Sequence, residues 1–234
     1  MKIGGRIIDR LRSTVCAIRP GGACGGRIVV VDHPLVAHRM TMMRDKSTPP
    51  KLFRELVGEV TTHLAYEALR DIRTKSVEVE TPVAGTTGAK VDEPGIVLVP
   101  ILRAGMGMLD AMLRVLPYAR VGVLGMQRND ETAEPVPYYA KVPPARTGDE
   151  LAIVLDPMLA TGGSVCDAVA QLKKLGYRRI RFICLVSAPE GIARFAAEHP
   201  DVPAFAAAKD ERLNSSFYIV PGLGDAGDRI FGTL

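Results

Sequence analysis

The sequence has no long uninterrupted apolar run, no cysteine pair with metal-ligand spacing and no internal repeat. A membrane-spanning helix needs roughly 18 consecutive apolar residues, so we expect no membrane-crossing segment. The four cysteines form no CxxC motif, and two of them, Cys166 and Cys184, lie in apolar stretches. This usage predicts buried, reduced thiols rather than a disulfide framework, and therefore a cytoplasmic protein.

An excess of basic residues is also missing from most of the chain. The net charge of +4 arises in the first 26 residues, which contain five Lys or Arg and a single Asp. The remainder carries equal numbers of basic and acidic residues. Nucleic-acid binding usually needs a basic face, so no nucleic-acid partner is expected.

Residues 1–29 are interpreted as a basic extension, and residues 30–234 as one domain. Apolar residues at helical spacing alternate with arginines in the first part, and two glycine pairs then predict a flexible joint. The extension lacks the uninterrupted apolar region of a secretory signal. We interpret it as non-essential, with a transit-like segment as the alternative.

From residue 28 onward, short apolar runs alternate with helical patterns. Strands are expected at 28–31, 77–81, 96–101, 121–126, 151–155 and 180–186, and helices at 51–72, 108–116, 164–175 and 191–199. Continuous apolar strands between helices predict an α/β fold, with a mostly parallel sheet flanked by helices on both faces. Residues 127–150 interrupt the pattern with proline, charge and tyrosine. They are expected to form a projecting β-arm or lid, or a solvated hairpin at an oligomer contact.

A segment of mostly small residues follows the expected strand 151–155 and precedes a helix. It consists of Asp156, Pro157, Met158, Leu159, Ala160, Thr161, Gly162, Gly163 and Ser164. Small residues let main-chain amides surround an anion, and the helix N-terminus adds partial positive charge. Asp156 would bind sugar hydroxyls or metal-bound water. The alternative is a connecting turn capped by Ser or Thr; the GK[ST] ending of a nucleotide-hydrolysing P-loop is absent.

Two arginines follow other expected strands. Arg103 comes after the strand 96–101, and Arg128 opens the polar stretch after 121–126. Ligands bind at the carboxyl ends of strands in such sheets, and a planar guanidinium suits a diphosphate. An ordinary surface ion pair is the alternative for Arg103.

Glycines are concentrated in a fourth segment, residues 218–228. Gly222, Gly224 and Gly227 formally match GxGxxG. A dinucleotide site would need a helix, a further strand and an acidic residue after the motif, and the sequence ends at Leu234. We expect instead that the backbone here lies close against a flat ligand.

Together these segments resemble the uracil phosphoribosyltransferase family over residues 30–234. The similarity is carried by residues 31–35, 43–46, 64–67, 100–105, 156–164, 188–191 and 221–233, and 221–228 is highly specific. Pro157 stands where most relatives of this sheet type have a second acidic residue. The first 29 residues match nothing in the family pattern.

The resemblance implies transfer of a phosphoribosyl group to uracil, giving uridine monophosphate and diphosphate. Phosphoribosyl pyrophosphate is expected to bind Arg103, Arg128, Asp225 and residues 156–164. Uracil is expected to bind Ile219, Gly224, Asp225 and Ala226, and catalysis is assigned to Arg103, Asp156 and Asp225.

The resemblance also bears on cofactor and assembly. Mg²⁺ is expected to act through substrate and water, with no protein ligand set. The resemblance implies a homodimer or homotetramer, with Tyr138 and Tyr139 as candidates for an intersubunit arm. It is also compatible with activation by GTP. Arg44 and Lys46 are interpreted as ordinary surface charge.

Two other functions compete with this one. A regulator that senses phosphoribosyl pyrophosphate and binds RNA would use the basic extension, but would not need a complete base-binding segment. A purine-specific transferase would need a base segment of a different pattern.

Overall fold

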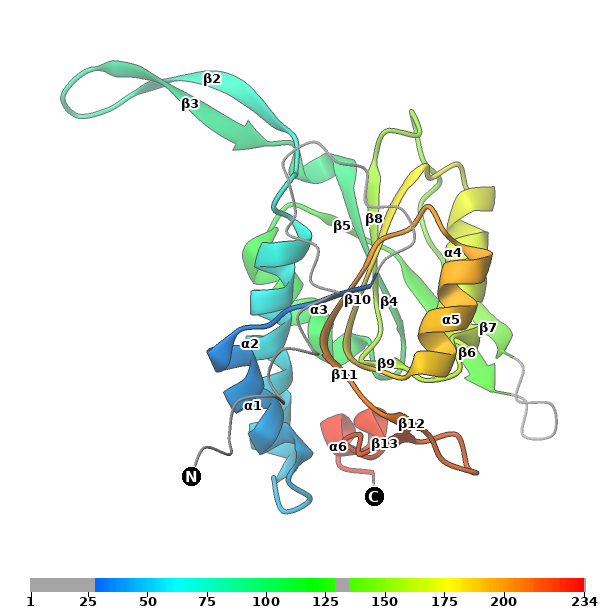
Figure 1. Cartoon of the computed structure of the whole chain (residues 1–234). Helices are drawn as coiled ribbons and strands as arrows, with labels where there is room; N and C mark the ends of the chain where they lie inside the picture. The colour runs from blue at the N-terminus through cyan, green and yellow to red at the C-terminus, as the bar shows by residue number, and fades with distance from the viewer. Residues whose placement is uncertain (1–27, 129–134, 234) are drawn as a thin grey trace, which may run out of the picture.

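The computed structural model describes residues 28–128 and 135–233. Its centre is a nine-stranded sheet in the order β1-β11-β10-β8-β4-β6-β7, to which β5 and β9 add short pairings (Figure 1). Neighbouring strands pair in parallel throughout, except β7, which is antiparallel to β6. The strands are β1 (Ile28–Val30), β4 (Ile96–Leu102), β5 (Arg120–Val121), β6 (Val123–Arg128), β7 (Pro135–Lys141), β8 (Leu151–Leu155), β9 (Met158–Leu159), β10 (Arg179–Ser187) and β11 (Ala204–Lys209). The predicted mostly parallel sheet is confirmed.

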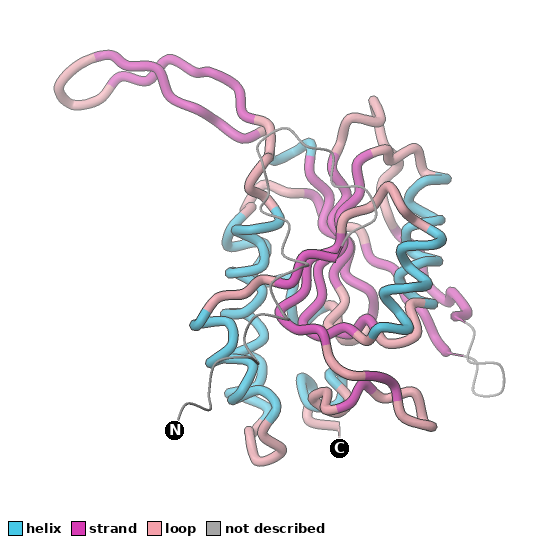
Figure 2. The backbone as a smooth tube through the Cα atoms, in the orientation of Figure 1, coloured by secondary structure: helices cyan, strands magenta, loops and turns pink. Residues whose placement is uncertain are grey.

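Helices cover both faces of this sheet (Figure 2). One face carries α1 (Pro34–Arg44), α2 (Pro50–Ala68) and α3 (Met106–Val115), and the other carries α4 (Gly163–Lys174) and α5 (Pro189–Glu198). A short α6 (Ala226–Phe231) follows the glycine-rich segment, and a 3₁₀ turn, η2 (Glu93–Gly95), precedes β4. Alternate strand residues enter the two cores: Leu98 and Ile153 pack with α1–α3, while Val97 and Val154 pack with α4 and α5.

Helix α1 and strand β11 are elements that the sequence patterns did not predict. Helix α1 buries only Val36, Met40 and Met43, so it has a narrow apolar stripe. Its start is marked by His33, whose ring nitrogen accepts the Leu35 amide at 3.2 Å. Strand β11 is alanine-rich and lacks the β-branched residues typical of strands.

The arm that projects from the structure is the hairpin of β2 (Thr74–Glu80) and β3 (Gly85–Val91), which lies outside the main sheet (Figure 1). Part of the stretch expected to form an arm, a lid or a solvated hairpin, residues 127–150, is a hairpin in which β7 pairs antiparallel with β6 and extends the sheet. Its role as a lid or oligomer contact stays a prediction. Residues 129–134 and the extension up to residue 27 lie outside the described residues. Tyr138 and Tyr139 are exposed on β7; their intersubunit role stays a prediction.

The expected thiol state agrees with the structure. Cys166 and Cys184 are free and buried, and burial raises the pKa of Cys166 to about 12 and that of Cys184 well above its usual value. Among the described residues, no helix has both the length and the apolarity that crossing a bilayer requires.

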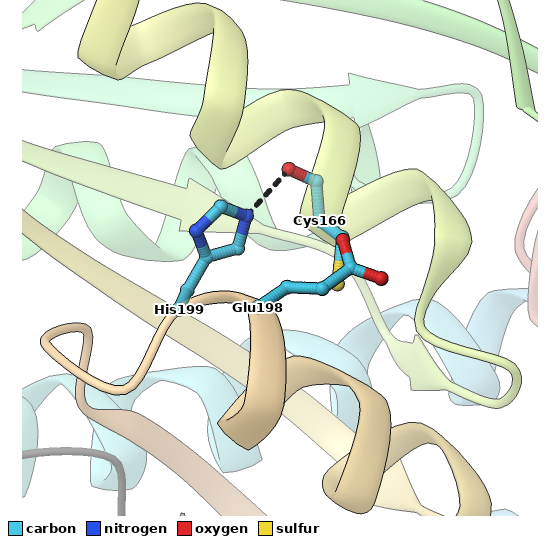
Figure 3. Close-up of side chains that lie close together, drawn as sticks. All are labelled: Cys166, Glu198 and His199. Carbon is cyan, nitrogen blue, oxygen red and sulfur yellow. Dashed lines mark hydrogen bonds between the residues drawn. The ribbon is translucent and has the colours of Figure 1, made fainter.

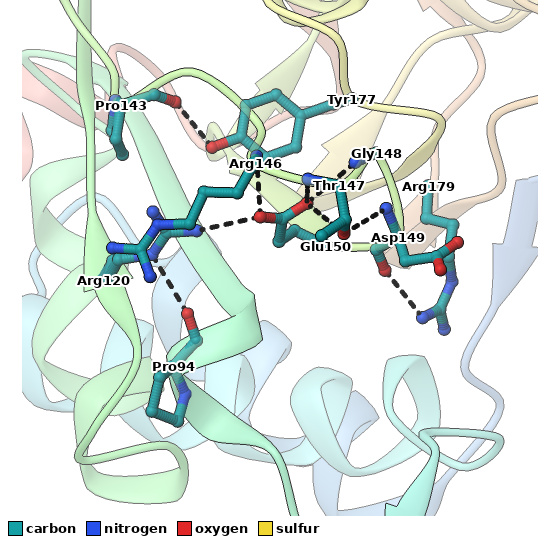
Figure 4. A network of polar contacts seen from close by, with 10 residues as sticks. All are labelled: Pro94, Arg120, Pro143, Arg146, Thr147, Gly148, Asp149, Glu150, Tyr177 and Arg179. Carbon is teal, nitrogen blue, oxygen red and sulfur yellow. Dashed lines mark hydrogen bonds and ion pairs between the residues drawn. The ribbon is translucent and has the colours of Figure 1, made fainter.

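A buried carboxylate organises the amino-terminal edge of the sheet (Figure 4). Glu150 accepts hydrogen bonds from the backbone amides of Arg146 (2.8 Å), Thr147 (3.2 Å) and Gly148 (3.1 Å), and lies 3.9 Å from a guanidinium nitrogen of Arg120. Burial alone would raise its pKa, but the amide hydrogen bonds outweigh burial and lower the pKa to about 2. This cluster closes the loop before β8, at the edge opposite the carboxyl ends of the strands.

Replacing Glu150 with Gln should lower the free energy of unfolding by about 2 kcal/mol at neutral pH, because one charged acceptor of several hydrogen bonds is lost. A depressed pKa stabilises the fold above the unfolded value, and this contribution disappears as pH falls from about 4.5 toward about 2. Denaturant unfolding across that range measures the difference between E150Q and the parent protein. A pH-independent difference would contradict the assignment.

Candidate active site

The candidate site lies where β4 and β8 end side by side. Arg103 follows β4, and Asp156 follows β8. A Cβ atom added to Gly105 would lie 2.3 Å from the carbonyl oxygen of Leu155 and 2.7 Å from that of Ile101. Only glycine allows this approach, so the turn after β4 lies directly against the turn after β8. The two strand ends that the sequence singled out are therefore brought together.

Arg103 extends from the first turn toward the C-terminal helix. Its side chain is 58% exposed, its Nη2 donates to Asp228 Oδ1 at 3.1 Å, and its guanidinium lies 5.9 Å from the ring centre of Phe231. Hydrogen bonds from Thr233 and Arg103 lower the pKa of Asp228. One exposed ion pair is weak, so the guanidinium is available to a more highly charged anion.

The phosphoribosyl loop, defined as residues 156–164, leads into helix α4. Gly162 at the N-cap has φ +81° and no side chain to satisfy the free amides of the first turn. The loop also contacts α5 closely, since a Cβ on Gly191 would lie 2.4 Å from the Ala160 carbonyl oxygen. Thr161 and Ser164 flank the helix start. This arrangement suits a sugar phosphate, as the sequence predicted.

Asp156 carries the strongest electrostatic perturbation in the site. Its carboxylate accepts the Met158 amide at 3.3 Å. Burial raises its pKa to about 7, and the negative charge of Asp225 adds to the increase. The two carboxylates therefore lie close enough to repel each other. A cation or hydroxyl donor placed between them would relieve that repulsion.

The base segment, defined as residues 218–228, completes the site. Ile219 and Ala226 are buried, whereas Gly224 and Asp225 are exposed. Asp225 is the N-cap of α6, and its Oδ1 accepts the Asp228 amide at 2.8 Å.

The same segment touches the turn after β4. A Cβ on Gly227 would lie 3.2 Å from Asp225 Oδ1 and 4.0 Å from Arg103 Nη2. The diphosphate and base halves of the predicted site are thus adjacent.

Arg128 is the last residue of β6, which runs parallel to β4 with Leu102 opposite Gly125. Its backbone therefore lies at the same edge of the sheet as Arg103. Its side chain lies outside the described part of the chain, and its diphosphate contact stays a prediction.

Sequence reasoning missed three residues that hold the base segment: Arg44, Asp210 and Arg229. The interpretation of Arg44 as ordinary surface charge was wrong, since it forms a bidentate ion pair with Asp210. Asp210 directly follows β11, so a charged residue at a strand end was the available signal. It was lost because β11 itself was not predicted.

A cluster of potential metal ligands lies outside this site, between α4 and α5 (Figure 3). It consists of Cys166, Glu198 and His199. His199 Nε2 lies 2.9 Å from the Cys166 carbonyl oxygen, and Nδ1 lies 3.3 Å from Lys173 Nζ. Glu198 pairs with Arg194. A metal would have to displace these contacts, so we interpret the cluster as packing between two helices.

The family model described as uracil phosphoribosyltransferase matches residues 30–233. The chain belongs to the uracil phosphoribosyltransferase family. Similar relatives of that name come from Dictyoglomus thermophilum (52% identity over 206 residues, 88% of this chain and 99% of the relative) and Exiguobacterium sibiricum (52% over 207 residues, 88% and 99%). The solved structure of the AQ2163 protein from Aquifex aeolicus is also similar, with TM-score 0.83 and 39% identity over 88% of this chain and 98% of that one.

In this uracil phosphoribosyltransferase family member, Asp156→Asn should stabilise the ligand-free fold at high pH. The raised pKa means that the folded state favours the protonated carboxyl, and this contribution is lost as pH rises through about 7. The Tm of D156N should therefore exceed that of the parent protein more at about pH 8 than at about pH 5. Thermal melting at both pH values checks this, and a Tm difference that shrinks with rising pH would refute it.

Proposed function

We propose that the protein transfers the phosphoribosyl group of phosphoribosyl pyrophosphate to uracil, forming uridine monophosphate and diphosphate in pyrimidine salvage. The observation that supports this most is the adjacency of three features at one sheet edge: the phosphoribosyl loop, Arg103 and the base segment. Each feature matches one part of the two substrates. Membership of the family supplies the same assignment independently.

The main chemical demand is charge on the leaving diphosphate. As the bond at the anomeric carbon breaks, the ribose takes on oxocarbenium-like character and negative charge accumulates on the departing group. Arg103 is placed to stabilise that charge after it exchanges Asp228 for the ligand. Loop amides at the start of α4 would hold the sugar phosphate. Asp156 would accept hydrogen bonds from the ribose hydroxyl groups.

Mg²⁺ fits this site through substrate oxygens and water. The carboxylates available are Asp156 and Asp225, whose mutual repulsion favours a nearby cation. Within the described residues, the group of three His, Cys, Asp or Glu side chains close enough to share a metal lies instead between α4 and α5. Mg²⁺ typically keeps several waters, and when bound it would neutralise charge on the diphosphate.

Base choice would depend on backbone groups of the base segment around Ile219, Gly224 and Ala226. Uracil presents an acceptor, a donor and an acceptor along one edge. Cytosine replaces one acceptor with an amino donor, which would face a protein donor. A buried mismatch of this kind gives strong discrimination. Asp225 already caps α6, so we assign it a positional role beside the sugar rather than a defined role as general base.

Assembly and regulation are proposed by family analogy. A homodimer or homotetramer is proposed, and its size is measurable by sedimentation. GTP is proposed as an activator, and adding it to the assay tests this. A cytoplasmic location is proposed because Cys166 and Cys184 are free thiols.

Arg103→Ala should lower kcat by at least about 100-fold, as expected for losing a donor aimed at developing charge. The fold should survive, because the side chain is exposed and makes one ion pair. Arg70→Ala serves as the control. It removes an exposed arginine that also makes an ion pair, with Glu67, but belongs to none of the predicted site segments. Steady-state kinetics and melting curves test both variants. Unchanged turnover in R103A would remove Arg103 from the mechanism.

Ala226→Val should raise the KM for uracil by about tenfold. An effect of this size is expected when a small amount of extra apolar volume is added at a binding site. Ala226 is buried in the core at the first turn of α6, so added volume would displace the backbone of the base segment while the phosphoribosyl loop is untouched. Formation of uridine monophosphate is measured, with cytosine, hypoxanthine and RNA binding as comparisons. Comparable turnover with cytosine would contradict the proposed recognition, and an unchanged uracil KM in A226V would place the base elsewhere.

A further inference from the structure

An ion pair between Arg44 and Asp210 joins the base segment to helix α1. Asp210 Oδ2 accepts the Gly222 amide at 2.8 Å, and Arg44 donates to both Asp210 oxygens, at 2.8 and 2.6 Å. Arg44 Nη1 also donates to the Gly222 carbonyl oxygen at 2.6 Å. Both polar groups of Gly222 are therefore bound to this pair. The Asp210 side chain is only 4% exposed and that of Arg44 25%, so water competes weakly for these bonds.

Gly222 occupies a position that controls the geometry of the base segment. It has φ +63°, and a Cβ there would lie 2.1 Å from the Ile219 carbonyl oxygen. The chain turns back on itself at this point, between Ile219 and Gly224. Holding both peptide groups of Gly222 therefore fixes how these two proposed uracil contacts face each other.

We propose that Arg44 and Asp210 are positioning residues for uracil recognition, acting through Gly222. This inference rests on the proposed base site at Ile219, Gly224 and Ala226. Among the described residues, the side-chain hydrogen bonds of this pair go to each other and to Gly222, and none goes to Arg103 or the phosphoribosyl loop. The pair should therefore govern the base half of the site and leave the phosphoribosyl half unchanged.

A second arginine, on α6, donates hydrogen bonds back to the end of α1. Arg229 of α6 donates to the carbonyl oxygens of Met43 (2.5 Å), Leu223 (2.8 Å) and Asp45 (2.6 Å), and its guanidinium lies 4.2 Å from the ring centre of Phe53. The C-terminal part of the segment thus stays attached to the end of α1 without Arg44. Loss of the Arg44 pair should loosen Gly222 without detaching the segment.

The test uses Arg44→Lys and Asp210→Asn, each a change that keeps most of the side-chain volume. Lysine lacks the planar fork needed to bind Asp210 and Gly222 together, and asparagine turns an acceptor toward Arg44 or Gly222 into a donor. The KM for uracil should rise by about tenfold or more, since a hydrogen bond to a charged group usually exceeds one tenfold step. The KM for phosphoribosyl pyrophosphate should stay unchanged.

Arg39→Met is the matched control, because Arg39 lies on the same helix and pairs with Glu59 of α2. It should leave both KM values unchanged. Melting curves establish that the R44K and D210N proteins are folded. Equal rises in both KM values would show general loosening and overturn the inference, as would an unchanged uracil KM in folded R44K and D210N.

The A226V variant separates the two levels of the proposal. If A226V raises the uracil KM while R44K and D210N do not, the base site stands and the positioning role of Arg44 and Asp210 is wrong. If none of the three affects uracil, the base site itself is misplaced.

Discussion

The contact of Gly105 with the end of β8 is the constraint on which the site depends. A single added carbon would collide with the Leu155 carbonyl oxygen at 2.3 Å. Without that approach, the turn carrying Arg103 could not lie against the turn carrying Asp156. The absence of a side chain allows close contact at two other glycines. Gly191 lets α5 approach the phosphoribosyl loop, and a Cβ on Gly107 would lie 2.8 Å from Ile230. Close backbone approach, rather than a large cavity, therefore brings the segments together.

Charges are satisfied very differently at the two edges of the sheet. At the amino-terminal edge, Glu150 is surrounded by amide donors and its pKa falls to about 2. At the carboxyl-terminal edge, burial and a neighbouring carboxylate raise the pKa of Asp156 to about 7, and Arg103 keeps one exposed partner. At the first edge the chain itself supplies the donors to the carboxylate, although the buried Arg120 Nη2 has no hydrogen-bond partner there. At the second edge, a cation would balance the carboxylates and an anionic substrate would balance Arg103. Unbalanced charges of this kind are typical of functional sites.

Much of this was predictable from sequence because parallel sheets place strand ends at a common edge. Arg103 and Asp156 follow continuous apolar strands, so their meeting follows from topology alone. The positions of Arg44 and Asp210 were not predictable, because α1 has a narrow apolar stripe and β11 is built largely of alanine. The projecting β2–β3 hairpin was not predicted as an arm for a similar reason. Its second strand, β3, contains glycine, threonine and alanine rather than an alternating apolar pattern.

The two halves of the site are held by different kinds of interaction. The phosphoribosyl loop is fixed by backbone: Pro157 and Leu159 carbonyls accept amides of Leu185 and Ala188 at 2.9 Å, so β10 and the start of α5 hold it in place. The base segment lies beyond the sheet and has no such strand neighbours on the main sheet within the described residues. Its residues Ile219 and Val220 pair antiparallel with Leu213 and Arg212 in a separate two-stranded sheet. Guanidinium groups that reach to and from the end of α1 hold the part of the segment that follows. Because the supports are separate, changes in base specificity can arise at α1 without disturbing the site for the sugar diphosphate.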